Sequence, residues 1–346
     1  MIIYVVFFLI LALLSIVNYK IEKSLKDYLL FTLFIILLIF IGFRDEVGGD
    51  WDTYKGDFNS YIQYFDITTL SYKRDFGYEL VSYVLYHLGF SIYSLNLFCA
   101  LIFVYALFAL GKEYNNYLII LLIAFPFFII IGAMGYIKQS TAFGFIILSF
   151  ISLKKDFYLR FLIYSFLAII FHKSSFPIAI ILIISKFRFD FKSLFILFII
   201  SLFSYLILSV DKSRILSYFI TDSYKSEGVY YRLFINLVAG AIFIFFHKKL
   251  HFNSFEKKFI SINILLTILG LYYALNYSTI VDRFLIYCSL IQLLIYPKFI
   301  NLNNNFSMKI FLGSSTFYLL ILIGWFTFSN FSLKWIPYNN LLFPGL

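Results

Sequence analysis

Charged residues are scarce in this chain, and their scarcity excludes most classes of soluble protein. Asp, Glu, Lys and Arg make up 13% of the 346 residues, and hydrophobic residues make up 62%. A soluble globular domain averages about 25% charged residues. The composition therefore predicts a polytopic membrane protein with an all-α fold, a bundle of transmembrane helices.

Cysteine is almost absent too, and so are the common catalytic motifs. Cys99 and Cys288 both lie within apolar runs, which predicts two small buried side chains and no disulfide framework. The sequence contains no GxSxG nucleophile motif, no HExxH zinc motif, no phosphate-binding P-loop and no glycine-rich dinucleotide fingerprint. We therefore expect no metal site and no cofactor.

Apolar segments separated by polar connections account for most of the chain. Within residues 158–185 the apolar run is interrupted by His172-Lys173-Ser174-Ser175, with Pro177 following, and this interruption predicts two short helices. We count about twelve segments in one integral membrane domain, residues 1–346, and several are shorter than the roughly 20 residues of a straight span. They lie at about 2–17, 28–43, 92–110, 117–132, 137–153, 158–171, 174–185, 193–210, 233–246, 259–276, 284–297 and 310–328.

Basic residues indicate which way the segments cross the membrane. Lys20, Lys23 and Lys26 lie in the first connection, which the positive-inside rule places in the cytoplasm. Alternation from there puts sixteen of the 28 Lys and Arg residues inside but only six of the 18 Asp and Glu residues, so the inner connections carry the whole formal net charge of +10. The positive charge therefore encodes topology, and no nucleic-acid partner is expected.

Two longer connections face outward on this topology. Residues 44–91 form an outer loop with four cations and eight acids, and residues 211–232 form a second loop. Between Asp75 and Leu88, tyrosines and aliphatic residues recur at mixed helical spacing, which is typical of a helix that lies in the membrane interface. The first loop also contains the pair Gly48-Gly49, and adjacent glycines let a ligand approach the backbone closely.

Polar residues that are costly inside a bilayer gather at the outer ends of the segments. Because five separate connections supply them, we expect them to converge on one outward-facing cavity. A cluster of cations suits a polyanionic headgroup such as pyrophosphate, since arginine binds phosphate oxygens bidentately. These residues are Arg44, Asp50, Lys138, Gln139, His172, Lys173, Arg232, Asp282 and Arg283.

Simpler interpretations stay open for several of these residues. Arg44 and Arg283 are also placed to snorkel from helix ends. Asp282-Arg283 can form a local ion pair, and His172 can be a satisfied polar residue at a helix break. Lys138 is harder to explain in this way, because a lysine at a helix N-terminus opposes the helix dipole unless an anion is near.

The tripeptide Asp50-Trp51-Asp52 has the form of a DxD motif. That motif holds a metal ion and nucleotide-sugar phosphates in many glycosyltransferases. Nucleotide sugars are cytoplasmic, whereas the predicted topology puts this pair outside. We therefore expect solvated loop acids with one functional carboxylate.

One stretch resembles the signature of the EpsG-type family of exopolysaccharide and O-antigen polymerases (the Wzy type): Arg44, followed by Val47-Gly48-Gly49-Asp50-Trp51-Asp52-Thr53-Tyr54. In that family an arginine after the second helix is followed by Val-Gly-x-Asp-x-x-x-Tyr. Further similarities follow in the same order along most of the chain. They are Gly77-Tyr78-Glu79 for a Glu-Pro-Gly segment, with the order changed and the proline absent, Lys138-Gln139 for Arg-Gln, Phe171-His172-Lys173-Ser174-Ser175 for a histidine motif, and Asp282-Arg283-Phe284 for a late arginine.

The resemblance implies a lipid-linked oligosaccharide polymerase of the bacterial cytoplasmic membrane, with its active site facing the periplasm or exterior. The donor would be a growing glycan on undecaprenyl pyrophosphate, and the acceptor a single lipid-linked repeat unit. His172, if phosphate surrounds it, would be protonated and act as another phosphate binder. Asp50 is therefore the preferred general base, and His172 is the alternative base. The pyrophosphate binders would be Arg44, Lys138, Arg232 and Arg283. The residues expected to contact sugar or shape the loop are Trp51, Tyr54, Tyr78, Glu79, Gln139 and Asp282. Membrane lipid is a further partner, and the resemblance leaves room for a protein that regulates chain length.

Two other functions stay open. About twelve segments also fit a transporter or flippase of lipid-linked sugars, but the polar residues cluster on one side and no inverted repeat is visible. An O-antigen ligase would share the donor and the cationic outer site.

Overall fold

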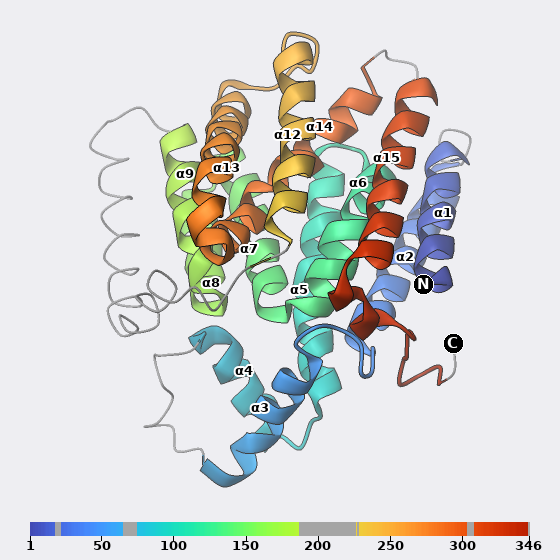
Figure 1. Ribbon diagram of the computed structural model, residues 1–346, viewed down its shortest axis with the longest axis vertical. Coiled ribbons are helices and arrows are strands. Elements are labelled where there is room, and N and C mark those ends of the chain that lie inside the picture. Colours follow the sequence, from blue (N-terminus) through green and yellow to red (C-terminus); the bar gives the residue numbers. More distant parts are fainter. Residues whose placement is uncertain (18–21, 65–74, 187–225, 227, 303–307, 345–346) are drawn as a thin grey trace. The chain divides into compact units, whose positions relative to one another are not determined.

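The computed structural model of this protein describes residues 1–17, 22–64, 75–186, 226, 228–302 and 308–344 (Figure 1). In these ranges the regular structure is helical, and the β contact is an isolated bridge between Arg44 and Asn340. Five helices are long and apolar enough to cross a membrane, which confirms the prediction of a helical membrane protein. They are α2 (Lys23–Gly42), α5 (Ile92–Glu113), α12 (Val229–Phe246), α13 (Ser254–Cys288) and α15 (Met308–Phe328). Shorter apolar helices are α1 (Ile2–Val17), α6 (Tyr117–Ala124) with the π-helical η3 (Phe125–Ala133), α8 (Tyr158–Phe171) and α14 (Leu290–Ile300).

The predicted interruption at His172 is confirmed. Helix α8 ends at Phe171, the short 3₁₀ helix η4 (Lys173–Ser175) follows, and α9 (Phe176–Lys186) begins directly after it. The other predicted apolar segments within the described ranges also fall on helices. The segment at 193–210 and most of the outer loop at 211–232 lie outside the described residues, so the count of twelve stays a prediction.

The first outer loop and α13 differ from the prediction. The loop contains α4 (Phe76–His87), close to the predicted helix, and also α3 (Trp51–Tyr64), which was not predicted. The location of α4 in the membrane interface stays a prediction. Helix α13 is kinked at the non-helical Tyr277 (φ −130°, ψ 45°), directly after the predicted end of the tenth segment at residue 276. Helix resumes after the kink, so Asp282 and Arg283 lie within helical turns and not in the predicted connection. A helix can hold this acid because Arg232 of α12 pairs with it.

The chain divides into two compact units. The first consists of residues 1–71, 76–144 and 307–346, and in it α2 packs on α5, α1 on α6, α15 on η3 and α3 on α4. The second consists of residues 72–75 and 145–306, and in it α13 packs against α9, α12 and α14. Helix α7 (Ile137–Lys154) contributes residues to both units.

Large apolar side chains remain exposed on the helices of both units. Phe245 on α12 and Phe328 on α15 are 80% and 87% exposed. Exposure of this kind is costly in water, at about 25 cal/mol per Å² of apolar surface, but costs little against lipid tails. The exposed side chains therefore fit a lipid-facing surface.

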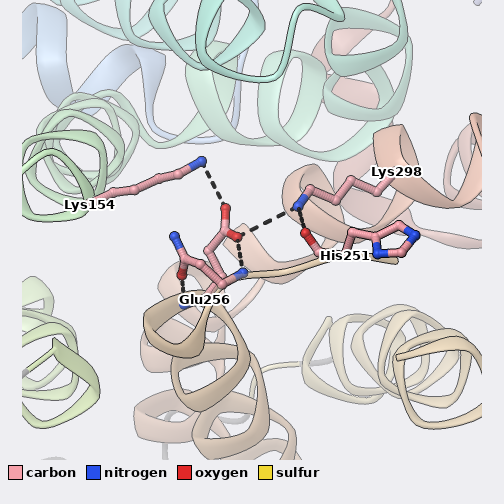
Figure 2. Close-up of polar contacts among 5 residues, drawn as sticks. Lys154, His251, Glu256 and Lys298 are labelled. Carbon is pink, nitrogen blue, oxygen red and sulfur yellow. Dashed lines mark hydrogen bonds and ion pairs between the residues drawn. The ribbon is translucent and has the colours of Figure 1, made fainter. Parts of the chain in front are cut away.

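In the second unit, Glu256 fixes the start of α13. The Asn253 side chain accepts a hydrogen bond from the Glu256 amide at 2.8 Å, and the Glu256 carboxylate accepts one from the Asn253 amide at 2.9 Å, which is a capping box. The same carboxylate lies 2.9 Å from Lys154 Nζ and 3.6 Å from Lys298 Nζ (Figure 2). Its side chain is 2% exposed. One buried carboxylate thus ties the ends of α7, α13 and α14 together.

We expect Glu256→Gln to lower the free energy of unfolding by about 2 kcal/mol, because Lys154 and Lys298 lose the charge that neutralises them. Thermal unfolding of the purified protein in detergent measures the change. Lys258→Gln, which removes an exposed charge on the same helix, is the control and should leave the stability unchanged. Equal melting temperatures for both variants would contradict this role of Glu256.

Candidate functional site

The loop after α2 is built around Arg44, which is 1% exposed. Its Nε donates to the carbonyl oxygens of Val47 at 3.1 Å and Met134 at 3.0 Å, and its Nη1 donates to the carbonyl oxygen of Ile41 at 2.6 Å. Burial lowers the pKa of Arg44 to about 10, so the guanidinium stays protonated at neutral pH. Carbonyl dipoles therefore compensate a buried cation, and the cation fixes the shape of the loop.

A glycine is required where this loop meets Met134. Gly48 has φ +117°, and a Cβ atom there would lie 2.2 Å from the Met134 carbonyl oxygen, the same atom that accepts from Arg44. Met134 directly follows the π-helical η3, and π-helical segments are frequent at functional sites. At Gly48, the missing side chain therefore lets the loop approach the protein's own backbone at Met134, and not a ligand.

The C-terminal segment closes over the same loop. Trp335 is 1% exposed and donates its Nε1 hydrogen to the carbonyl oxygen of Ile130 at 2.9 Å. A Cβ atom at Gly135 would lie 2.6 Å from the Trp335 ring, so the indole sits directly against the backbone. Three backbone hydrogen bonds join the segments, from Asp45 N to Asn339 O (3.0 Å), from Gly48 N to Lys334 O (2.9 Å) and from Leu341 N to Phe43 O (2.8 Å). Sequence reasoning missed this closure, because pairing across nearly the whole chain leaves no local pattern.

Lys138 faces two tyrosine rings in the first unit. Its Nζ lies 4.7 Å from the ring centroid of Tyr78 and 5.6 Å from that of Tyr54, and both tyrosines are buried. The two rings are 5.6 Å apart, and Arg44 acts electrostatically on the same two side chains. The Arg44 guanidinium also lies over the ring of Trp51, 5.7 Å from its centroid. We call these five residues the Arg44–Lys138 site.

The start of α3 gives the two acids of the DxD-like tripeptide different surroundings. Trp51 is 3% exposed, and its indole N–H has no hydrogen-bond partner within the described ranges. Asp50 is half-buried, and its carbonyl oxygen accepts a hydrogen bond from the Tyr54 amide at 3.0 Å. Asp52 is exposed in the first turn of the helix, where a negative charge is favourable. Only Asp50 is thus placed close to the protein interior.

The remaining polar residues predicted for this region are buried. Glu79 is 4% exposed and Gln139 is 9% exposed. They directly follow Tyr78 in α4 and Lys138 in α7, so each adjoins a member of the Arg44–Lys138 site in the sequence.

In the second unit, His172 pairs with Asp75. The Nδ1 atom of His172 lies 3.2 Å from Oδ2 of Asp75, and the backbone N–H of Lys173 donates to Oδ1 at 3.4 Å. Their side chains are 13% and 17% exposed, so the pair is not fully buried. Sequence reasoning missed Asp75 as a site residue, since nothing in its surroundings singles it out from the other acids of the outer loop.

A second polar cluster of this unit joins α12 to α13. Arg232 forms an ion pair with the carboxylate of Asp282, and its Nη1 also donates to the Asp282 carbonyl oxygen at 3.3 Å. Ser226 donates its hydroxyl hydrogen to Oδ2 of Asp282 at 2.8 Å. Asp282 therefore pairs with Arg232. The alternative of a local ion pair between Asp282 and Arg283 is wrong. Arg283 is half-buried and acts electrostatically on Tyr287, as Asp75 does.

The structure thus assembles the predicted residues in two groups. Arg44, Lys138, Trp51, Tyr54 and Tyr78 gather in the first unit, and the second unit contains the His172–Asp75 pair and the Arg232–Asp282 pair, with Arg283 next in sequence. The expectation that all of them converge on one outward-facing cavity stays a prediction.

The protein is helical and has several apolar spans, and its cations lie against aromatic rings and carbonyl groups. These features define a multi-pass membrane protein with polar sites at its helix ends. The model of the EpsG family matches residues 27–340, and the chain belongs to this family. The resemblance seen in the sequence motifs is therefore confirmed. No curated protein and no solved structure matches the chain.

We expect Gly48→Ala to lower the free energy of unfolding by about 2 kcal/mol, because the added Cβ meets the Met134 carbonyl oxygen at a positive φ. Gly56→Ala is the matched control, since Gly56 lies within α3 with open space around it. This variant should be slightly more stable than the wild type, because alanine favours a helix more than glycine does. Thermal unfolding in detergent compares the two. A Gly48→Ala variant as stable as the wild type would show that the loop does not depend on this close approach.

Proposed function

We propose that this protein polymerises lipid-linked oligosaccharides at the outer face of the bacterial cytoplasmic membrane. It transfers a growing glycan from undecaprenyl pyrophosphate to the next lipid-linked repeat unit, and so builds O-antigen, capsular polysaccharide or exopolysaccharide. The observation that carries the proposal is the Arg44–Lys138 site, in which two cations act on the same two tyrosines. Membership of the EpsG family supports a polysaccharide polymerase-like function.

The leaving group decides what the site must supply. When the bond between the sugar and pyrophosphate breaks, its electron pair moves to a phosphate oxygen, and fixed cations stabilise the charge that develops there. The proposed pyrophosphate binders are Arg44 and Lys138 of the first unit and Arg232 and Arg283 of the second unit. The cations themselves stabilise the leaving group, so the proposal contains no metal ion and no cofactor.

Arg44 and Lys138 suit different parts of this task. Arg44 is nearly inaccessible and bound to three main-chain carbonyl groups, so it shapes the loop and contributes its field. Lys138 is half-buried, and its ammonium group lies against aromatic rings. A cation–π contact attracts a cation without neutralising it, so Lys138 keeps its charge for an anionic ligand.

The aromatic residues of the site fit a sugar substrate. Tyr54, Tyr78 and Trp51 present flat apolar faces beside polar tips, the combination that sugar rings require. Glu79 and Gln139, and Asp282 of the second unit, are the residues proposed to form hydrogen bonds with the sugar. The acceptor hydroxyl also needs a general base, for which the sequence offers Asp50 and His172.

The proposed orientation follows from charge. The inner connections carry the excess of Lys and Arg, which leaves the Arg44 loop outside. Lipid-linked donor and acceptor are the partners expected there, together with membrane lipid and a regulator of chain length. A flippase of lipid-linked sugars would need polar residues in both halves of the membrane for alternating access. An O-antigen ligase would use the same donor but another acceptor.

We expect Lys138→Gln to reduce long-chain polysaccharide about 100-fold, because one fixed cation at the leaving group is lost. Lys138→Arg should keep chain length, since the family has arginine at this position. The variants are made in the native host, their membrane levels are matched, and surface polysaccharide is sized on gels. Lys112→Gln, an exposed lysine at the end of α5, is the control and should behave as the wild type.

Single repeat units displayed at the cell surface of the Lys138→Gln strain are the product that a stalled polymerase predicts. Normal chain length in that strain would contradict the site assignment. Repeat units trapped at the inner leaflet would instead favour a flippase.

A further inference from the structure

The His172–Asp75 pair joins two connections that the topology places on the outer face. Asp75 directly precedes α4, and His172 directly follows α8. Oδ2 of Asp75 faces Nδ1 of His172, and Oδ1 accepts from the backbone N–H of Lys173. Both oxygens of one carboxylate therefore hold a single turn of chain, and the imidazole is fixed relative to that turn.

This contact selects the tautomer of the neutral imidazole. A carboxylate only accepts hydrogen bonds, so Nδ1 must carry the hydrogen that it donates to Asp75. Nε2 is then left with its lone pair on the opposite edge of the ring. The side chain keeps 13% of its surface exposed, so the ring is not fully enclosed by protein.

The charges around the pair favour proton transfer over anion binding. An imidazolium next to a carboxylate adds little net positive charge, so His172 is a poor candidate for holding pyrophosphate. Among the described residues, Lys173 lies on the same turn, and Asp75 and Arg283 both act electrostatically on Tyr287 of α13. Arg232 and Arg283 are the proposed pyrophosphate binders of this unit, so His172 is left for another role.

We propose that His172 is the general base of polymerisation and that Asp75 positions it. This inference rests on the proposed function. Nε2 takes the proton of the acceptor hydroxyl while the hydroxyl oxygen bonds to the anomeric carbon of the donor sugar. The bond from that carbon to pyrophosphate breaks, and its electron pair leaves with undecaprenyl pyrophosphate. Asp75 stabilises the imidazolium until His172 releases the proton to water.

The test is steady-state kinetics of the purified full chain in lipid nanodiscs, with an undecaprenyl-pyrophosphate-linked repeat unit as substrate. Asp75→Asn should lower kcat about 100-fold with KM within about threefold, because the amide neither fixes the tautomer nor stabilises the imidazolium. Asp75→Glu, which restores the carboxylate, should recover most of kcat. Asp27→Asn, which removes an exposed carboxylate from α2, should leave both constants unchanged.

His172→Gln and the double variant separate positioning from a structural effect. His172→Gln should lose as much kcat as Asp75→Asn, and the double variant should be no slower than His172→Gln, because the two residues act as a unit. His172→Gln keeps Asp75, so it tests the base even where Asp75→Asn does not fold, which melting temperatures reveal.

The inference would be overturned if Asp75→Asn kept the kcat of the wild type. It would also be overturned if the double variant lost kcat by the product of the two single losses. A loss of kcat in Asp50→Asn that His172→Gln does not share would overturn it as well. In each of these cases polymerisation by the wild type still supports the proposed function. If the wild type makes no polymer, the proposed function fails, and the inference fails with it.

Discussion

Burial of the Arg44 cation is the constraint on which the first unit depends. An isolated charge inside a protein costs several kcal/mol, so the carbonyl groups around Arg44 must stay where they are. They come from the end of α2, from the loop itself and from Met134 beyond η3. This arrangement brings the backbone so close at Gly48 that a side chain would not fit. The C-terminal segment then covers the loop through Trp335 and the backbone pairs around it.

The two units treat their cations differently, and the difference bears on function. In the second unit Arg232 is paired with Asp282, and His172 with Asp75. In the first unit Arg44 is compensated by carbonyl dipoles, and Lys138 lies against tyrosine rings. Dipoles and π faces stabilise a cation but leave its net charge in place. In the proposed function, the first unit therefore keeps a positive field suited to a phosphate leaving group. The second unit contributes the proposed binders Arg232 and Arg283 and a carboxylate–imidazole pair suited to moving a proton.

Much of the fold could be predicted from the sequence, because long apolar runs report burial in lipid directly. The interruption at His172 could be predicted for the same reason, since four polar residues in such a run are costly in a bilayer. Helix α3 was missed, because the polar residues between its buried apolar side chains, Trp51, Tyr54 and Phe58, look like a loop. The kink at Tyr277 directly follows the predicted end of the tenth segment at residue 276. The turns after the kink, which contain Asp282, were not predicted as helix, and Arg232 neutralises the charge of Asp282 there.

The candidate site could be predicted only in part. Arg44, Lys138 and His172 stood out because each is a costly polar residue at the end of an apolar run. Asp75 and Trp335 did not, because their importance comes from partners far away in the chain. The spacing of residues along the sequence gives no signal of such long-range pairing, so the partners can be identified only in the folded structure.

In the proposed function, this chain alone forms the glycosidic bond between lipid-linked units. The most direct measurement supplies the purified protein with undecaprenyl-pyrophosphate-linked repeat units, a metal chelator and no nucleotide sugar, and sizes the glycan products over time. We expect a ladder of polymers, with one undecaprenyl pyrophosphate released for each bond formed. Repeat units that stay single, or that lengthen only when a nucleotide sugar is added, would rule out this function.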